Sequence, residues 1–192
     1  MKTTHLSLFC SVAFLTSAHA SEFTLASSFD SVPAFVAAAK AFRPAESKTD
    51  IARLFTVAEM GQPEDPKTGQ PVAPASLDSC EAVWEGATQA LVFAVATPKT
   101  EATRSAIGVL FLLSQSGHHW SISDSQRFTA TGKYAGVTCE LTADGGSGYQ
   151  LGQEGMRPIV TIKESQGGRG YGYELSASYT FTDSRLKRLD LE

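Results

Sequence analysis

The sequence has few of the residues that support metal sites and nucleic-acid binding. It contains four histidines among 192 residues, and acidic side chains outnumber lysine and arginine, which gives a formal net charge of −4. Nucleic-acid binding depends on clustered basic side chains that displace counterions from phosphates. The basic residues here are interleaved with acidic ones, even in the richest run, 185–190. The composition therefore argues against a nucleic-acid partner.

The sequence also lacks an apolar run of the roughly 20 residues that a membrane-spanning helix needs. The apolar stretch 6–15 is shorter, follows Lys2 and precedes a small-x-small pattern at 18–20. This order is typical of a cleaved secretory signal peptide. We therefore expect removal of residues 1–20 and export of 21–192 as one soluble domain. The expected destination is the bacterial periplasm or, alternatively, the extracellular space.

Cysteine is scarce as well, because the expected mature chain keeps only Cys80 and Cys139. Exported proteins meet oxidising compartments in which disulfides form and persist. The pair predicts a Cys80–Cys139 disulfide, which in the chain-entropy model would stabilise the fold by roughly 4 kcal/mol. Two free thiols are the alternative interpretation.

Residues 29–60 have the apolar spacing of helices. Within 29–42, apolar side chains recur at helical intervals, Asp30 or Ser31 can cap the start, and Pro44 ends the pattern. The apolar positions are Val32, Phe35, Val36, Ala39 and Phe42. We expect one helix here, with that face buried.

A second helix is expected within 47–61. Ser47 and Asp50 resemble a capping box with aspartate in place of the usual glutamate, and Gly61 suits the end. The apolar face would consist of Ile51, Leu54, Phe55 and Ala58. The following segment, 61–76, is rich in proline and glycine, has no apolar period and predicts an extended loop.

Residues 77–192 have the pattern of antiparallel strands. Segments 90–97 and 106–113 are continuously apolar, which is expected of strands covered on both faces. Apolar and polar residues alternate strictly in 171–182, which predicts one buried and one solvent-exposed face. Further strands are expected within 118–128, 137–142, 158–163 and 186–191. Short connections favour antiparallel pairing, so we predict an α+β fold with two N-terminal helices packed on a six- or seven-stranded antiparallel β-meander.

One glycine-rich segment, Gln166-Gly167-Gly168-Arg169-Gly170, precedes the alternating strand. Phosphate-binding glycine loops lead from a strand into a helix, whereas this segment leads into a strand. The main interpretation is therefore a hairpin bend whose glycines adopt positive φ. The alternative is a binding tip in which Arg169 combines with Tyr171 and Tyr173, since arginine and tyrosine dominate many interfaces.

Other candidate chemistry has less support in the sequence. Adjacent His118 and His119 on a strand would point to opposite faces and could not easily hold one metal ion. Ser147 lies in a GGSG segment without the spacing of a nucleophile elbow. We therefore assign no catalytic residue, metal or cofactor, and expect a protein that is not an enzyme.

The order of two helices and a meander, with the segment GHHWSISD at 117–124, resembles cone-shaped α+β domains of the nuclear-transport-factor type. No residue role is carried over from this resemblance. The leading hypothesis is a non-enzymatic module that binds a protein, peptide or envelope component. The alternative is a small-molecule-binding or hydrolytic domain with a pocket between sheet and helices, where Glu85, Asp124 or Lys163 would supply ionisable groups. A structural subunit of an envelope assembly is a third hypothesis.

Overall fold

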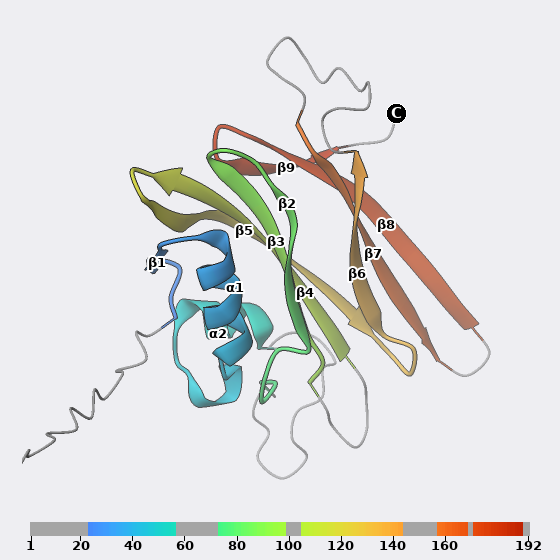
Figure 1. Ribbon diagram of the computed structural model, residues 1–192. Helices are drawn as coiled ribbons and strands as arrows, with labels where there is room; N and C mark the ends of the chain where they lie inside the picture. Colours follow the sequence, from blue (N-terminus) through green and yellow to red (C-terminus); the bar gives the residue numbers. More distant parts are fainter. Residues whose placement is uncertain (1–22, 57–72, 99–104, 144–156, 169–170, 190–192) are drawn as a thin grey trace, which may run out of the picture.

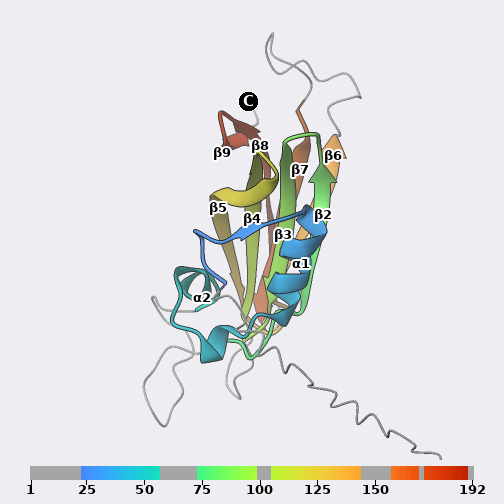
Figure 2. The same cartoon turned by 60° about the vertical axis from the view of Figure 1, so that its left-hand side comes forward.

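The computed structural model describes residues 23–56, 73–98, 105–143, 157–168 and 171–189. Within them the chain forms three layers, namely a helical layer, a middle sheet and a second sheet (Figures 1 and 2). The helices are α1 (Val32–Ala41), the short 3-10 helix η1 (Pro44–Glu46) and α2 (Asp50–Phe55). The strands are β1 (Ser28–Phe29), β2 (Ser79–Glu85), β3 (Gln89–Ala96), β4 (Ser105–Ser116), β5 (His119–Thr131), β6 (Gly136–Ala143), β7 (Ile159–Gly168), β8 (Tyr171–Thr182) and β9 (Arg185–Leu189).

The strands belong to two antiparallel sheets instead of one. The first sheet has the order β1-β5-β4-β3-β2, and the second has the order β6-β7-β8-β9. Apart from β1, each sheet is a meander of consecutive hairpins, so the α+β class and the antiparallel pairing are confirmed. The prediction of a single six- or seven-stranded sheet is wrong. After β5 the chain leaves the first sheet, and β6 begins a second sheet that faces it (Figure 1).

Strand β2 is absent from the sequence prediction because its apolar residues do not alternate. Its pairing with β3 shifts register between Ala82 and Trp84, which is the signature of a β-bulge. Before the shift, Cys80 packs on the helical side of the sheet; after it, Trp84 packs toward the second sheet. The bulge therefore moves the apolar side chains from one face to the other, and a period of two cannot detect the strand.

Helix α1 follows the prediction closely. Ser31, not Asp30, caps it by accepting a hydrogen bond on Oγ from the Ala34 N–H at 3.2 Å. Phe35 is fully buried, and its ring meets that of Phe111 on β4 with centroids 5.5 Å apart. The helices thus cover one face of the first sheet (Figure 2). No helix in the described residues is both long and apolar enough to cross a membrane.

Helix α2 forms within the expected range but has a different cap. Thr49 Oγ1 accepts from the Ala52 N–H at 3.3 Å, while Ser47 Oγ bonds to Thr49 at 3.0 Å. Asp50 Oδ1 accepts from the N–H of Leu25, a residue far away in sequence. The predicted capping box of Ser47 and Asp50 is therefore wrong. The helix ends at Phe55 with Thr56 as its C-cap, so the expected end at Gly61 is wrong. Residues 57–72, which hold most of the proline-rich loop, lie outside the described residues.

The middle layer confirms the two continuously apolar strands. In β4, residues 105–113 are all buried. Ile107, Val109, Phe111 and Leu113 pack on the helical side, and Ala106, Leu110 and Leu112 pack toward the second sheet. A Cβ on Gly108 would point toward the second sheet and approach the Phe93 ring to 2.6 Å and a Val137 methyl group to 2.7 Å, so glycine lets these side chains pack closely. Two hydrophobic cores, one on each side of the first sheet, therefore stabilise the fold.

The predicted disulfide is not present. Cys80 and Cys139 are both free thiols. Cys80 belongs to the core beneath the helices, whereas Cys139 packs against the core between the sheets. The two side chains therefore occupy opposite faces of the first sheet. Burial raises the pKa of each thiol from 9.0 to about 12, because an apolar environment disfavours the charged thiolate.

Candidate binding edge and inter-sheet pocket

Strand β8 is paired on both sides along only part of its length. It pairs with β7 from Tyr171 to Tyr179, but β9 pairs with it only from Ser178 to Thr182. Residues 171–177, which we call the free edge, therefore have no neighbouring strand on that side within the described residues (Figure 1). Residues 172–176 are all exposed.

The hydrogen bonds around β9 show which main-chain groups point outward at the free edge. The N–H of Leu186 donates to Asp124 Oδ2 at 2.8 Å, so it points away from its β8 partner Phe181. Phe181 and Leu186 are therefore a non-hydrogen-bonded pair, and in antiparallel sheets such pairs alternate with hydrogen-bonded pairs. By this alternation, the N–H and C=O groups that point outward from the free edge are those of Gly172, Glu174 and Ser176.

Side chains on the inner face of β8 change from buried to exposed along the strand. Tyr179 and Phe181 are 8% and 3% exposed, whereas Tyr173 and Leu175 are 52% and 51% exposed. The strict alternation predicted a single buried face, and the structure confirms it only for the end of the strand that the first sheet covers. Toward the free edge, the inner face of β8 presents an apolar surface to solvent.

The three residues proposed for binding have different outcomes. Arg169 lies outside the described residues, and the side chain of Tyr171 is also outside them. Tyr173 lies on the free edge, where its hydroxyl donates to Gln166 Oε1 at 2.9 Å. Gly167 and Gly168 belong to β7 and pair with β8, so the predicted loop is shorter than expected.

The outer face of the second sheet is acidic beside the free edge. Glu174 is exposed there, and Lys163 Nζ lies 2.9 Å from Glu140 Oε2 on the neighbouring strands. The hydrogen bond and the charge of Glu140 raise the pKa of Lys163, and the charge of Glu174 contributes in the same direction. The carboxylates of Glu140 and Glu174 therefore lie near a single ammonium group, that of Lys163. Glu174 forms no ion pair with another described residue.

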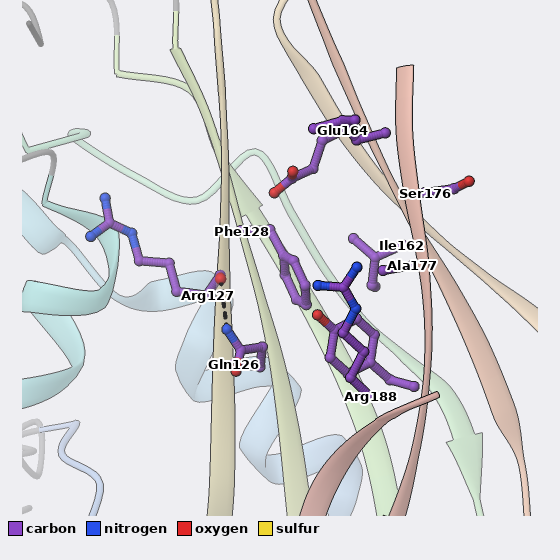
Figure 3. A pocket seen from close by; sticks show the side chains of 10 residues that line it. Gln126, Arg127, Phe128, Ile162, Glu164, Ser176, Ala177 and Arg188 are labelled. Carbon is purple, nitrogen blue, oxygen red and sulfur yellow. Dashed lines mark hydrogen bonds between the residues drawn. The ribbon is translucent and has the colours of Figure 1, made fainter. Parts of the chain in front are cut away.

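A pocket of about 290 Å³ opens between the sheets where β9 ends. This volume is near the lower limit for small-ligand pockets, roughly 300 Å³. Figure 3 shows Glu164 and Arg188 entering from the second sheet beside Phe128 of the first sheet. Phe128 packs edge-on against Tyr179 at 5.2 Å, and burial raises the pKa of the Tyr179 hydroxyl. The lining residues are Gln126, Arg127, Phe128, Ile162, Glu164, Leu175, Ser176, Ala177, Tyr179 and Arg188.

Two carboxylates beside this pocket fasten one sheet to the other. Glu164 Oε1 on β7 accepts from the Thr129 N–H of β5 at 3.1 Å. Asp124 on β5 accepts from Leu186 of β9 and lies 3.9 Å from the Arg185 guanidinium. Each carboxylate therefore satisfies a main-chain donor at the edge of the opposite sheet. Sequence reasoning missed this role because each contact joins residues that are distant along the chain.

In the part of the chain that the structure describes, aromatic and aliphatic side chains pack between the first sheet and the helices, where the sequence left open a pocket. None of the three ionisable residues expected for a pocket, Glu85, Asp124 and Lys163, lines the inter-sheet pocket. His119 Nδ1 lies 3.4 Å from Asp30 Oδ1, with both side chains exposed. Among the described residues, no group of three or more His, Cys, Asp or Glu side chains could hold a metal ion. Ser147 lies outside them.

No protein family model matches the chain, and neither a curated protein nor a solved structure matches it. Function is therefore inferred from the free edge of β8 and the pocket beside it. The small-molecule alternative stays a prediction.

Proposed function

We propose that the protein is a binding module that captures an extended segment of a partner polypeptide as an additional strand on the free edge of β8. The observation that carries this proposal is the pairing of residues 171–177 on one side only, as far as the described residues show. In strand addition, main-chain hydrogen bonds hold the ligand and alternate side chains select it. The hairpin tip considered from the sequence lies at one end of this edge.

The composition of the free edge supports this proposal. Edge strands are commonly protected from other chains by charged side chains, especially lysine, by proline or by a bulge, and the free edge has one charged residue, Glu174. Residues 171–177 contain neither lysine nor proline, and their pairing with β7 shows no register shift. Instead, the edge presents Tyr173 and Leu175, each about half exposed. These features favour a ligand that pairs with the main chain and packs on the two apolar side chains.

The energetics indicate that main-chain pairing alone is insufficient. Six hydrogen bonds to Gly172, Glu174 and Ser176 would contribute about 3–9 kcal/mol at 0.5–1.5 kcal/mol each. Ordering a five-residue segment costs about 5–10 kcal/mol, which nearly cancels that contribution. Net affinity must therefore come from apolar burial against Tyr173 and Leu175, and we expect dissociation constants in the micromolar range.

The proposal includes export, because residues 1–20 have the pattern of a secretory signal. The partner would then be an exported protein, a peptide or a component of the cell envelope. Strand addition requires no catalytic group, metal or cofactor. Such a partner is recognised through its extended main chain and the side chains that flank it.

Replacing Ser176 tests strand addition. Its N–H points outward, so Ser176→Pro removes a donor from the free edge without removing a hydrogen bond to β7. Ser176→Ala keeps the N–H and is the matched control. Ten-residue peptides would be selected from a displayed library on the wild-type protein and measured by fluorescence anisotropy. We expect at least tenfold weaker binding to Ser176→Pro and a change below threefold for Ser176→Ala.

Folding of both variants would be checked by circular dichroism and thermal unfolding. If a folded Ser176→Pro variant binds the selected peptides as tightly as the wild type, strand addition at this edge is excluded.

A further inference from the structure

We infer that the strand added to β8 is a partner segment that carries lysine or arginine beside Glu174, flanked by apolar residues, and is not a second copy of this chain. This inference rests on the proposed function and names the chemistry of its ligand. It follows from the position of Glu174 at the centre of the free edge and from the main-chain groups on either side of it.

Glu174 is available to a cation that approaches from the free side. Its side chain is exposed on the outer face, and its neighbour across the β7–β8 pair is the uncharged Ser165. Lys163, the nearby cation, is held by Glu140 at 2.9 Å. In sheets, opposite charges on directly opposed residues stabilise pairing, and like charges destabilise it. A basic residue next to Glu174 therefore complements this edge.

Self-association would place like charges together. A two-fold dimer requires β8 to pair antiparallel with its own copy. The register that uses every outward main-chain group opposes Gly172 to Ser176 and Glu174 to the same glutamate of the second copy. If the register of the two β8 copies shifted toward Ser178, the second copy would meet the position that β9 already occupies. If it shifted the other way, fewer residues of the described strand would pair with the second copy. The only register that would use all the outward main-chain groups therefore places two Glu174 carboxylates opposite each other, and their repulsion disfavours the dimer.

The inner face determines the residues that flank the basic one. Side chains alternate between faces along a strand, so the neighbours of the basic residue would lie beside Tyr173 and Leu175. Both are about half exposed, and apolar partner side chains would remove this surface from water. The expected ligand therefore has an apolar–basic–apolar order within an extended segment.

Two defined peptides test this charge preference. Both are blocked nonapeptides of alternating valine and threonine, with the central threonine replaced by lysine in one and by glutamate in the other. Their affinities would be measured by fluorescence anisotropy at low ionic strength. The wild type should bind the lysine peptide about fivefold more tightly than the glutamate peptide. Glu174→Lys should reverse this order, and Glu174→Gln should make the two affinities similar.

Other outcomes separate this inference from the proposed function. Equal affinity of the wild type for both peptides, with both lost in Ser176→Pro, would overturn the charge preference but leave strand addition intact. No binding of either defined peptide would overturn the inference, and failure of the library selection as well would count against strand addition. A wild-type dimer in light scattering that becomes a monomer in Ser176→Pro would identify a second copy as the occupant, whereas a wild-type monomer supports the inference.

Discussion

At the scale of single residues, the thiol chemistry of Cys80 and Cys139 follows from burial. Cys80 is 1% exposed in the core beneath the helices, and Cys139 is partly buried against the core between the sheets. Desolvation is the first cause of the raised pKa of each thiol, and the nearby Glu81 carboxylate raises both further. The neutral thiol is thereby stabilised in the folded state, and nucleophilic reactivity is suppressed because the thiolate is the reactive form.

This difference in pKa predicts a loss of stability at alkaline pH. The thiols of the unfolded chain titrate near 9.0, whereas those of the folded chain keep their protons up to about 12. Between these values the unfolded state binds fewer protons, so the free energy of unfolding decreases as pH rises, by at most about 1.4 kcal/mol per pH unit for each thiol. Below pH 9 the contribution is fully present. Urea unfolding from pH 8 to 11, compared with the Cys80→Ala/Cys139→Ala variant, measures the thiol contribution separately from lysine and tyrosine titration.

The same residues distinguish free thiols from the predicted disulfide. Iodoacetamide at pH 8 should label the folded protein slowly and the urea-unfolded protein at both cysteines. An intact mass lower than that of the reduced chain by two hydrogens would contradict the free-thiol state.

At the scale of elements, α2 shows how tertiary contacts choose among similar local signals. Ser47, Thr49 and Asp50 are all residues that favour helix starts, and the local sequence does not separate them. In the structure, Asp50 accepts the Leu25 N–H and Thr49 Oγ1 accepts the Ala52 N–H. The same Asp50 oxygen also accepts from the Ile51 N–H at 2.8 Å. The Ser47 N–H, which a capping box would pair with Asp50, donates instead to the Pro44 carbonyl oxygen at 3.2 Å. By contrast, α1 has its cap at Ser31, one of the two residues that its local sequence offered.

We expect Thr49→Ala to lower the free energy of unfolding by about 1 kcal/mol, because it removes the cap of α2. Ser47→Ala is the matched control and should cost less than half as much, since Ser47 supports Thr49 without accepting from the helix. Urea denaturation of both variants measures the difference. If Ser47→Ala proves to be the more costly substitution, the capping box predicted from the sequence would be the correct description.

At the scale of the whole molecule, two kinds of interaction hold the two sheets together. One is the hydrophobic core between the sheets, and the other is a set of contacts at the margins of the sheets. On one side, Asp124 and Glu164 bind main-chain N–H groups of the opposite sheet. At a corner, Gly132 forms an isolated bridge with Gly167. Gly132 has a φ of +112°, and a Cβ there would lie 2.2 Å from the Gly167 carbonyl oxygen. The close approach of the two backbones therefore requires glycine at this position.

Gly132→Ala should destabilise the protein by about 3 kcal/mol, because overpacking adds to the strain of a side chain at positive φ. Gly117→Ala is the matched control, since Gly117 also has positive φ, +62°, but a Cβ there meets nothing within 4 Å. The control should cost about 1 kcal/mol. Thermal unfolding of both variants checks the comparison, and equal effects would show that the sheets do not depend on this corner.

The sequence by itself determined the α+β class, helix α1, the doubly covered strands β3 and β4, and antiparallel pairing of consecutive strands. These properties follow from local periodicity, capping residues and short connections, which act over a few residues. Only the tertiary structure decided the division into two sheets, the separation of Cys80 from Cys139, the inter-sheet pocket and the free edge of β8. Each of these depends on where segments that are distant in the chain come together. The bulge in β2 and the end of β9 also leave no mark on the periodicity of apolar residues in the sequence.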